Sequence, residues 1–173
     1  MRLLALIGAL AILLVIGAAV FFGGGYYSVA GTAEEPAVLK WILAKVRMAS
    51  VNRHAGDYSP AGFDSPAKVQ DGARKFAEHG CANCHGAPGV DWAKFAEGLR
   101  PEPPELKDIV KDRTPSQLFW VVKNGINMTG MPSFGAAGVK DDDIWSIVAF
   151  VKKLPDVSEA DYKSWTAPAP RPQ

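Results

Sequence analysis

The chain has 173 residues, a formal net charge of +1 and two cysteines. That length allows one ordinary domain with an appendage. The near-neutral charge, without a long basic run, gives no electrostatic reason to expect a nucleic-acid partner. Cys81 and Cys84 lie too close in sequence to join distant parts of the chain, which excludes a disulfide framework.

An uncharged apolar run from Leu3 to Phe22 comes first along the chain. About twenty helical residues span roughly 30 Å, the thickness of the hydrocarbon core of a bilayer. We therefore expect one transmembrane helix in an N-terminal anchor at residues 1–25, with Arg2 on the cytoplasmic side and the body of the protein in the periplasm. A cleaved signal peptide is the alternative, because Ser28-Val29-Ala30 has small residues spaced as at a cleavage site, although secretory apolar regions usually cover only about 7–15 residues.

A juxtamembrane helix and a linker are predicted for residues 26–64. Residues 34–50 carry apolar side chains at helical spacing, and the Gly and Pro residues after them indicate a linker. The cations Lys40, Lys45 and Arg47 suit a helix that lies near lipid head groups. Packing of the same helix on the main domain is an equal alternative, and the sequence leaves both open.

The main domain is predicted at residues 65–156, and it is all-α because no strand-like alternation of useful length occurs. Its three longer helices start at capping residues or acidic residues that favour a helix N-terminus. These starts are Ser65-Pro66, Thr114-Pro115-Ser116-Gln117 and Asp141-Asp142-Asp143. Residues 86–111 are rich in Pro and Gly, so we expect no long element there, and residues 157–173 form a C-terminal tail that is extended and disordered from Ala167.

The sequence Cys81-Ala82-Asn83-Cys84-His85 fits the C-x-x-C-H signature of haem attachment. Two thiols on one helical turn can each add to a haem vinyl group, and the next residue then offers its imidazole to the iron. A redox pair would need no following histidine, and a zinc site would need four ligands, which His54 and His79 do not complete. We therefore predict one covalently attached haem c.

The second axial ligand should come from the loop after the middle helix, which holds Met128 and Met131. Met131 is the preferred ligand because Gly130 and Pro132 on either side let the backbone approach closely and keep it stiff, whereas Met128 suits the haem wall or core. The predicted cofactor-binding residues are Cys81, Cys84, His85 and Met131, and the iron ligands among them are His85 and Met131. Because both axial positions are then filled, we predict an electron carrier without catalytic residues or a small-molecule substrate, in preference to a haem enzyme or gas sensor.

Several of these motifs together resemble class I cytochromes c of bacterial membranes, over roughly residues 66–155. They are Cys81-Ala82-Asn83-Cys84-His85-Gly86, Asn124-Gly125-Ile126, Gly130-Met131-Pro132 and a final helix that contains a tryptophan. The resemblance implies a few helices wrapped around one haem, with the first and last helices crossing where Gly72 and Phe76 meet Ala149 and Phe150. It also implies that a proline carbonyl orients the proximal imidazole, and Pro104 matches that position best.

The expected function is single-electron transfer by a membrane-tethered monohaem cytochrome c. The partners that this function implies are redox proteins in the periplasm or membrane, with no nucleic acid among them. The alternative is a dedicated cytochrome c subunit of a periplasmic dehydrogenase or terminal oxidase complex. The two differ in how permanently the partner is bound.

Overall fold

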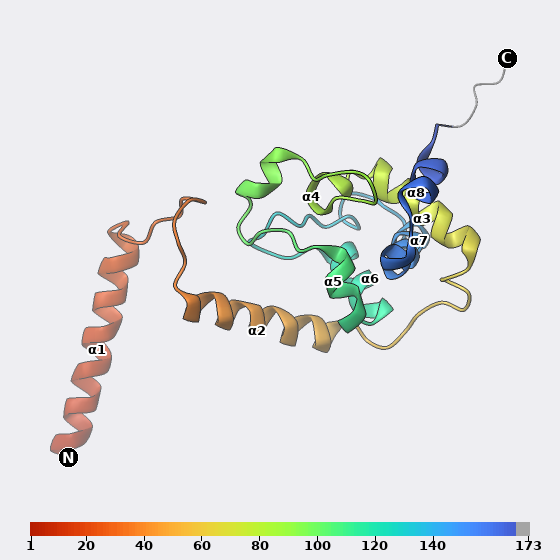
Figure 1. Ribbon diagram of the computed structural model, residues 1–173. Helices are drawn as coiled ribbons and strands as arrows, with labels where there is room; N and C mark the ends of the chain where they lie inside the picture. Colours follow the sequence, from red (N-terminus) through yellow and green to blue (C-terminus); the bar gives the residue numbers. More distant parts are fainter. Residues whose placement is uncertain (169–173) are drawn as a thin grey trace. The chain divides into compact units, whose positions relative to one another are not determined.

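Every regular element in the described part of the chain, residues 1–168, is a helix (Figure 1). The computed structural model has eight α-helices and three short 3-10 helices there, and no β-strand beyond one isolated bridge between Ala87 and Val90. The prediction of an all-α protein is therefore confirmed. The chain divides into two units, Met1–Glu35 and Pro36–Gln173.

The first unit contains α1 (Arg2–Gly23), an uninterrupted helix of 22 residues. At 1.5 Å per residue it is about 33 Å long. None of its residues is buried, and its length and composition are sufficient to cross a membrane. The helix expected at Leu3–Phe22 is therefore present, whereas its place in a bilayer stays a prediction.

The second unit begins with α2 (Ala37–His54), which starts later and ends later than the predicted 34–50 helix. Its C-terminal half packs on α6 (Pro115–Asn124). Val51 is 3% exposed there, and the Gln117 amide donates a hydrogen bond of 2.9 Å to the side-chain oxygen of Asn52. Of the two predicted alternatives, packing on the domain is thus confirmed for this half of α2. The linker between α2 and the next helix is shorter than predicted.

The core forms where α3 (Pro66–Glu78) crosses α7 (Asp141–Lys153). The helices approach so closely that a Cβ atom at Gly72 would lie 1.8 Å from the carbonyl oxygen of Ser146. One turn further on, the rings of Phe76 and Phe150 meet edge to face with centroids 5.2 Å apart. The crossing of the first and last domain helices at Gly72 and Phe76, which the resemblance implied, is confirmed.

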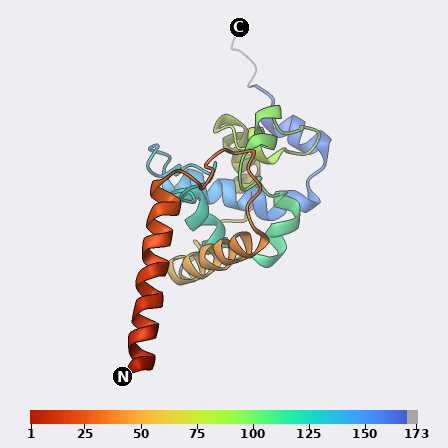
Figure 2. The same cartoon turned by 90° about the vertical axis from the view of Figure 1, so that its left-hand side faces the viewer.

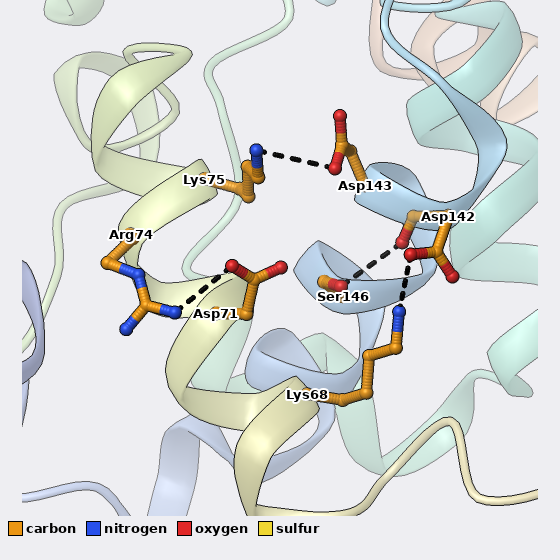
Figure 3. Close-up of polar contacts among 7 residues, drawn as sticks. All are labelled: Lys68, Asp71, Arg74, Lys75, Asp142, Asp143 and Ser146. Atoms are coloured by element: carbon orange, nitrogen blue, oxygen red, sulfur yellow. Dashed lines mark hydrogen bonds and ion pairs between the residues drawn. The ribbon is translucent and has the colours of Figure 1, made fainter.

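Three consecutive aspartates at the start of α7 each pair with a lysine of a neighbouring helix, and Figure 3 shows the two pairs with α3. The N···O distances are 2.6 Å for Lys68–Asp142, 3.3 Å for Lys75–Asp143 and 2.8 Å for Lys123–Asp141. The aspartates also lie at the positive end of the helix dipole, as the sequence predicted. They therefore fix the start of α7 to both α3 and α6.

The capping box of α6 is confirmed: Gln117 N donates to Thr114 Oγ1, and Thr114 N donates to the Gln117 side chain. Ser65 occupies the N-cap of α3 but makes no side-chain capping bond. Only short helices occupy residues 86–111, as expected. The short helices of the unit are α4 (Ala82–His85), η1 (Lys94–Gly98), α5 (Leu106–Ile109), η2 (Val110–Asp112) and η3 (Leu154–Asp156).

Helix α8 (Glu159–Thr166) lies in the segment predicted as a tail, and the sequence did not reveal it. It packs on α3, and its Tyr162 is 4% exposed and stacks on Phe150 with ring centroids 5.6 Å apart. Residues 157–166 therefore contribute to the core. Most of the stretch expected to be disordered, residues 169–173, lies outside the described residues.

Candidate functional site

The cysteine motif forms a single helical turn directly after α3. Cys81 N donates to the carbonyl of Phe76, and His85 N donates to the carbonyl of Cys81 at 3.1 Å, so the motif is tied to the core at its start. Cys81 and Cys84 are free thiols and partly buried. Burial raises the pKa of the Cys81 thiol to about 12, so this thiol is protonated at neutral pH.

The imidazole of His85 is oriented by the backbone of the proline-rich loop. His85 Nδ1 lies 3.0 Å from the carbonyl oxygen of Pro104. A carbonyl can only accept, so Nδ1 carries the proton and Nε2 keeps a free lone pair. Burial lowers the pKa of His85, with the Pro104 bond opposing, which favours the neutral ring that a metal requires. The contact with Pro104, which the resemblance implied, is confirmed.

Hydrogen bonds within the loop after α6 hold the backbone of Met131. Ile126 N donates to the Met131 carbonyl at 3.1 Å, and Met131 N donates to Thr129 Oγ1 at 3.1 Å. The Thr129 hydroxyl in turn donates to the Ile126 carbonyl at 2.7 Å. Met131 is partly buried, whereas Met128 has a positive φ of 58° and a side chain that is 90% exposed. This difference favours Met131 over Met128 as a ligand.

Leu99 is a residue of this region that sequence reasoning missed. A Cβ atom at Gly130 would lie 2.8 Å from Leu99 Cδ1, so the leucine packs directly against the methionine loop. Leu99 follows η1 in an irregular segment without periodicity, and no local pattern links it to a residue so distant in sequence.

A cavity of about 680 Å³ borders His85 on the side of the loop at residues 86–92. That volume lies within the range of cofactor and ligand pockets. Its lining includes Leu106, Leu154 and Glu159. Met131 does not line it, so the cavity is an open recess beside His85 only, and the two predicted ligands do not enclose it together. Glu159 of α8 packs against Gly89, which places α8 at the edge of this recess.

The donor set fits a haem better than a bare metal ion. Two free thiols on one turn, an imidazole with a free Nε2 and a thioether on a stiff loop suit covalent attachment and axial ligation. Within residues 1–168 no group of three or more His, Cys, Asp or Glu side chains is placed to hold a metal. The other histidines are engaged elsewhere: His54 stacks on Trp120, and His79 lies against Phe134.

Comparison with protein families gives the same assignment. Residues 67–151 match the family model described as cytochrome C oxidase, cbb3-type, subunit III, which is a c-type cytochrome. The matched segment runs from α3 into α7 and includes the cysteine motif and both loop methionines. Comparisons with curated proteins and with solved structures gave no match. Residues 67–151 therefore belong to the c-type cytochromes, electron carriers with covalently attached haem c.

Proposed function

We propose that this chain is a membrane-tethered monohaem cytochrome that passes single electrons between redox proteins of the periplasm or membrane. In this role Cys81 and Cys84 attach the haem, and His85 and Met131 are the axial ligands. The observation that carries the proposal is the hydrogen bond of 3.0 Å from His85 Nδ1 to Pro104, which leaves Nε2 free for iron. The bound haem supplies a one-electron iron couple.

The two cysteines make the attachment permanent. Cys81 and Cys84 would each be joined to one haem vinyl group through a thioether, with the thiol proton ending on the other vinyl carbon. Cys81 starts the turn, and its backbone N–H donates a hydrogen bond to the carbonyl of Phe76 in α3. A thioether at Cys81 would therefore also link the haem to the α3–α7 core. As thioethers, both sulfurs would no longer titrate.

The two axial side chains explain why electron transfer is preferred to catalysis. If His85 and Met131 hold the iron, an imidazole and a thioether would occupy the positions that a substrate would otherwise need. Helix α1 is the proposed anchor, with the haem domain on the periplasmic side, supported by its length, its apolar composition and Arg2 before it.

Haem stoichiometry and membrane attachment test this proposal together. Intact-mass spectrometry of protein matured in a host that attaches haem c should give one haem per chain, and the Cys81→Ala, Cys84→Ala double variant should give none. Wild-type protein should remain in the membrane after alkaline washing, with protease access to the domain from the periplasmic side. Haem-free wild-type protein, or a domain digested only from the cytoplasmic side, would contradict the proposal.

A second function is favoured by the family description, which names a subunit of an oxidase. In that case the domain would deliver electrons within one complex. Purification in mild detergent separates the two possibilities. Protein that elutes alone supports a shuttling carrier, and co-purification with a redox enzyme in fixed stoichiometry supports a dedicated subunit.

A further inference from the structure

The N-terminal half of α2 carries a large apolar surface that no described residue of the second unit, residues 36–168, covers. Four of its side chains are spaced so that they share one face of the helix. They are Val38 at 69% exposure, Trp41 at 62%, Ile42 at 44% and Val46 at 60%. The C-terminal half of the same helix is instead packed on α6, so the two halves have different surroundings.

The charges of α2 are of one sign. Residues 37–54 contain lysines and arginines but no aspartate or glutamate. Lys45 and Arg53 follow Ile42 and Val46 by three and seven residues, which places them on the same exposed face. Lys45 Nζ also lies 5.9 Å from the ring centroid of Trp41, so a cation and an aromatic ring are adjacent. Apolar side chains flanked by cations and a tryptophan are the composition of helices that lie in a membrane interface.

The connection between α1 and α2 is short. Residues 24–36 join the two helices and cannot span more than about 45 Å even when fully extended. If α1 crosses the bilayer, as proposed above, the start of α2 lies no further than about 45 Å from the membrane surface. Local concentration then favours even weak binding of this face to the membrane surface.

We propose that the exposed face of α2 binds a bilayer surface that contains anionic phospholipids, with the apolar side chains among the acyl chains and the cations at the head groups. Helix α2 is fixed to α6 through Val51 and the hydrogen bond between Gln117 and Asn52. Binding of α2 to the membrane would therefore restrict how the whole domain turns above the bilayer. The proposal rests on the membrane attachment proposed for α1. Helix α2 is then an orienting element as well as a connection.

An environment-sensitive fluorophore on the variant Val46→Cys tests the contact in the haem-loaded full chain. The protein is reconstituted into vesicles of phosphatidylcholine, with and without phosphatidylglycerol. The label should shift to shorter wavelength and be quenched by nitroxide lipids when phosphatidylglycerol is present. The same label at Lys163→Cys on α8, which lies away from α2 in Figures 1 and 2, should stay water-like.

Charge variants test the lipid preference. Lys45→Gln with Arg53→Gln should lower the ratio of lipid-bound to free label about twenty-fivefold, because each cation near an anionic surface contributes about fivefold to binding. The exposed pair Lys153→Gln with Lys163→Gln removes the same charge elsewhere and should leave the ratio unchanged.

Flotation of the vesicles separates failure of this inference from failure of the tether. Protein that floats with the vesicles while the Val46 label stays water-like overturns the α2 contact alone. Protein that does not float overturns both. A label that is shielded only in detergent, in the presence of a co-purifying protein, would assign this face to a protein partner and overturn the lipid contact.

Discussion

At the scale of single residues, the site depends on His85 and on the loop that holds Met131. The Pro104 carbonyl fixes the tautomer of the imidazole, so the ring presents Nε2 as a ligand without a choice of orientation. The backbone of Met131, the other proposed ligand, is held by hydrogen bonds to Thr129 and Ile126. Both proposed ligands are therefore positioned by hydrogen bonds within the protein.

Replacing Met131 should change the reduction potential. In Met131→His, the thioether that favours reduced iron is lost, so we expect the midpoint potential to fall by about 0.1–0.4 V, part of the roughly 0.8 V range that axial ligands cover. Potentiometric titration measures the change. Met128→Leu is the matched control, because that side chain is exposed, and its potential should equal that of the wild type. A fall in potential in the Met128 variant alone would show that Met131 is not the ligand.

At the scale of elements, the contact of α3 with α7 is the least tolerant part of the domain. In Gly72→Val, the new side chain would collide with the backbone of Ser146, and the helices would have to separate. We expect a loss of about 3 kcal/mol or more in the free energy of unfolding, measured with denaturant on the haem-loaded protein. Gly98→Ala is the control: no described atom lies within 4 Å of its Cβ position, so the free energy of unfolding should change by no more than about 0.5 kcal/mol. Equal stability of both variants would contradict the crossing.

The ion pair of Lys75 with Asp143 should make stability depend on alkaline pH. The hydrogen bond to Asp143 raises the pKa of Lys75 in the folded state, although burial opposes this. A raised folded-state pKa stabilises the protein below the unfolded-state pKa of about 10.4, and the benefit disappears as pH rises through the folded-state value.

Lys75→Met should therefore be less stable than the wild type by under about 1 kcal/mol near neutral pH, and this gap should close above roughly pH 10.4. Urea unfolding at a series of pH values measures the gap. The control Lys94→Met removes a pair within η1 in which the lysine is 88% exposed, so its stability should not change. A gap for Lys75→Met that stays constant to high pH would rule out the pair as its cause.

Most of the helices, but not all of their contacts, could be predicted from the sequence. The starts of α3, α6 and α7 followed from local capping residues and from the acidic run at residues 141–143. Helix α8 could not be foreseen, because it is short and its stability comes from burying Tyr162 against Phe150, a tertiary contact. The same limit applies to the lysine partner of each aspartate, which depends on how the helices pack.

In the site, too, local sequence motifs could be predicted and contacts between distant segments could not. The cysteine motif and the Gly-Met-Pro loop are local sequences with strict spacing, so the candidate residues could be named in advance. The bond of His85 to Pro104 followed only from the resemblance. The contact of Leu99 with Gly130 was not foreseen, because it joins irregular segments that no periodic pattern relates.

At the scale of the whole molecule, the domain should depend on its haem for cooperative folding. A domain of about 90 residues has a limited core. Two large apolar side chains near the site, Leu106 at the recess and Ile126 in the methionine loop, are only partly buried by the protein itself. A bound haem would cover such surfaces and so stabilise the folded state.

The haem-free double variant Cys81→Ala, Cys84→Ala should therefore melt broadly and without a sharp near-ultraviolet transition. The helical signal of α1 should survive in detergent, which serves as an internal control. Circular dichroism of the variant and of the haem-loaded wild type measures both. A cooperative transition of the haem-free protein at the wild-type temperature would show that the core is sufficient alone.

The optical spectrum of the reduced wild-type protein, with and without carbon monoxide, tests the central claim most directly. That claim is an iron atom whose two axial positions are filled by His85 and Met131. The account predicts a six-coordinate spectrum that carbon monoxide does not change on mixing. Rapid binding of carbon monoxide, or a five-coordinate spectrum at rest, would show an open iron position and contradict the assignment as an electron carrier.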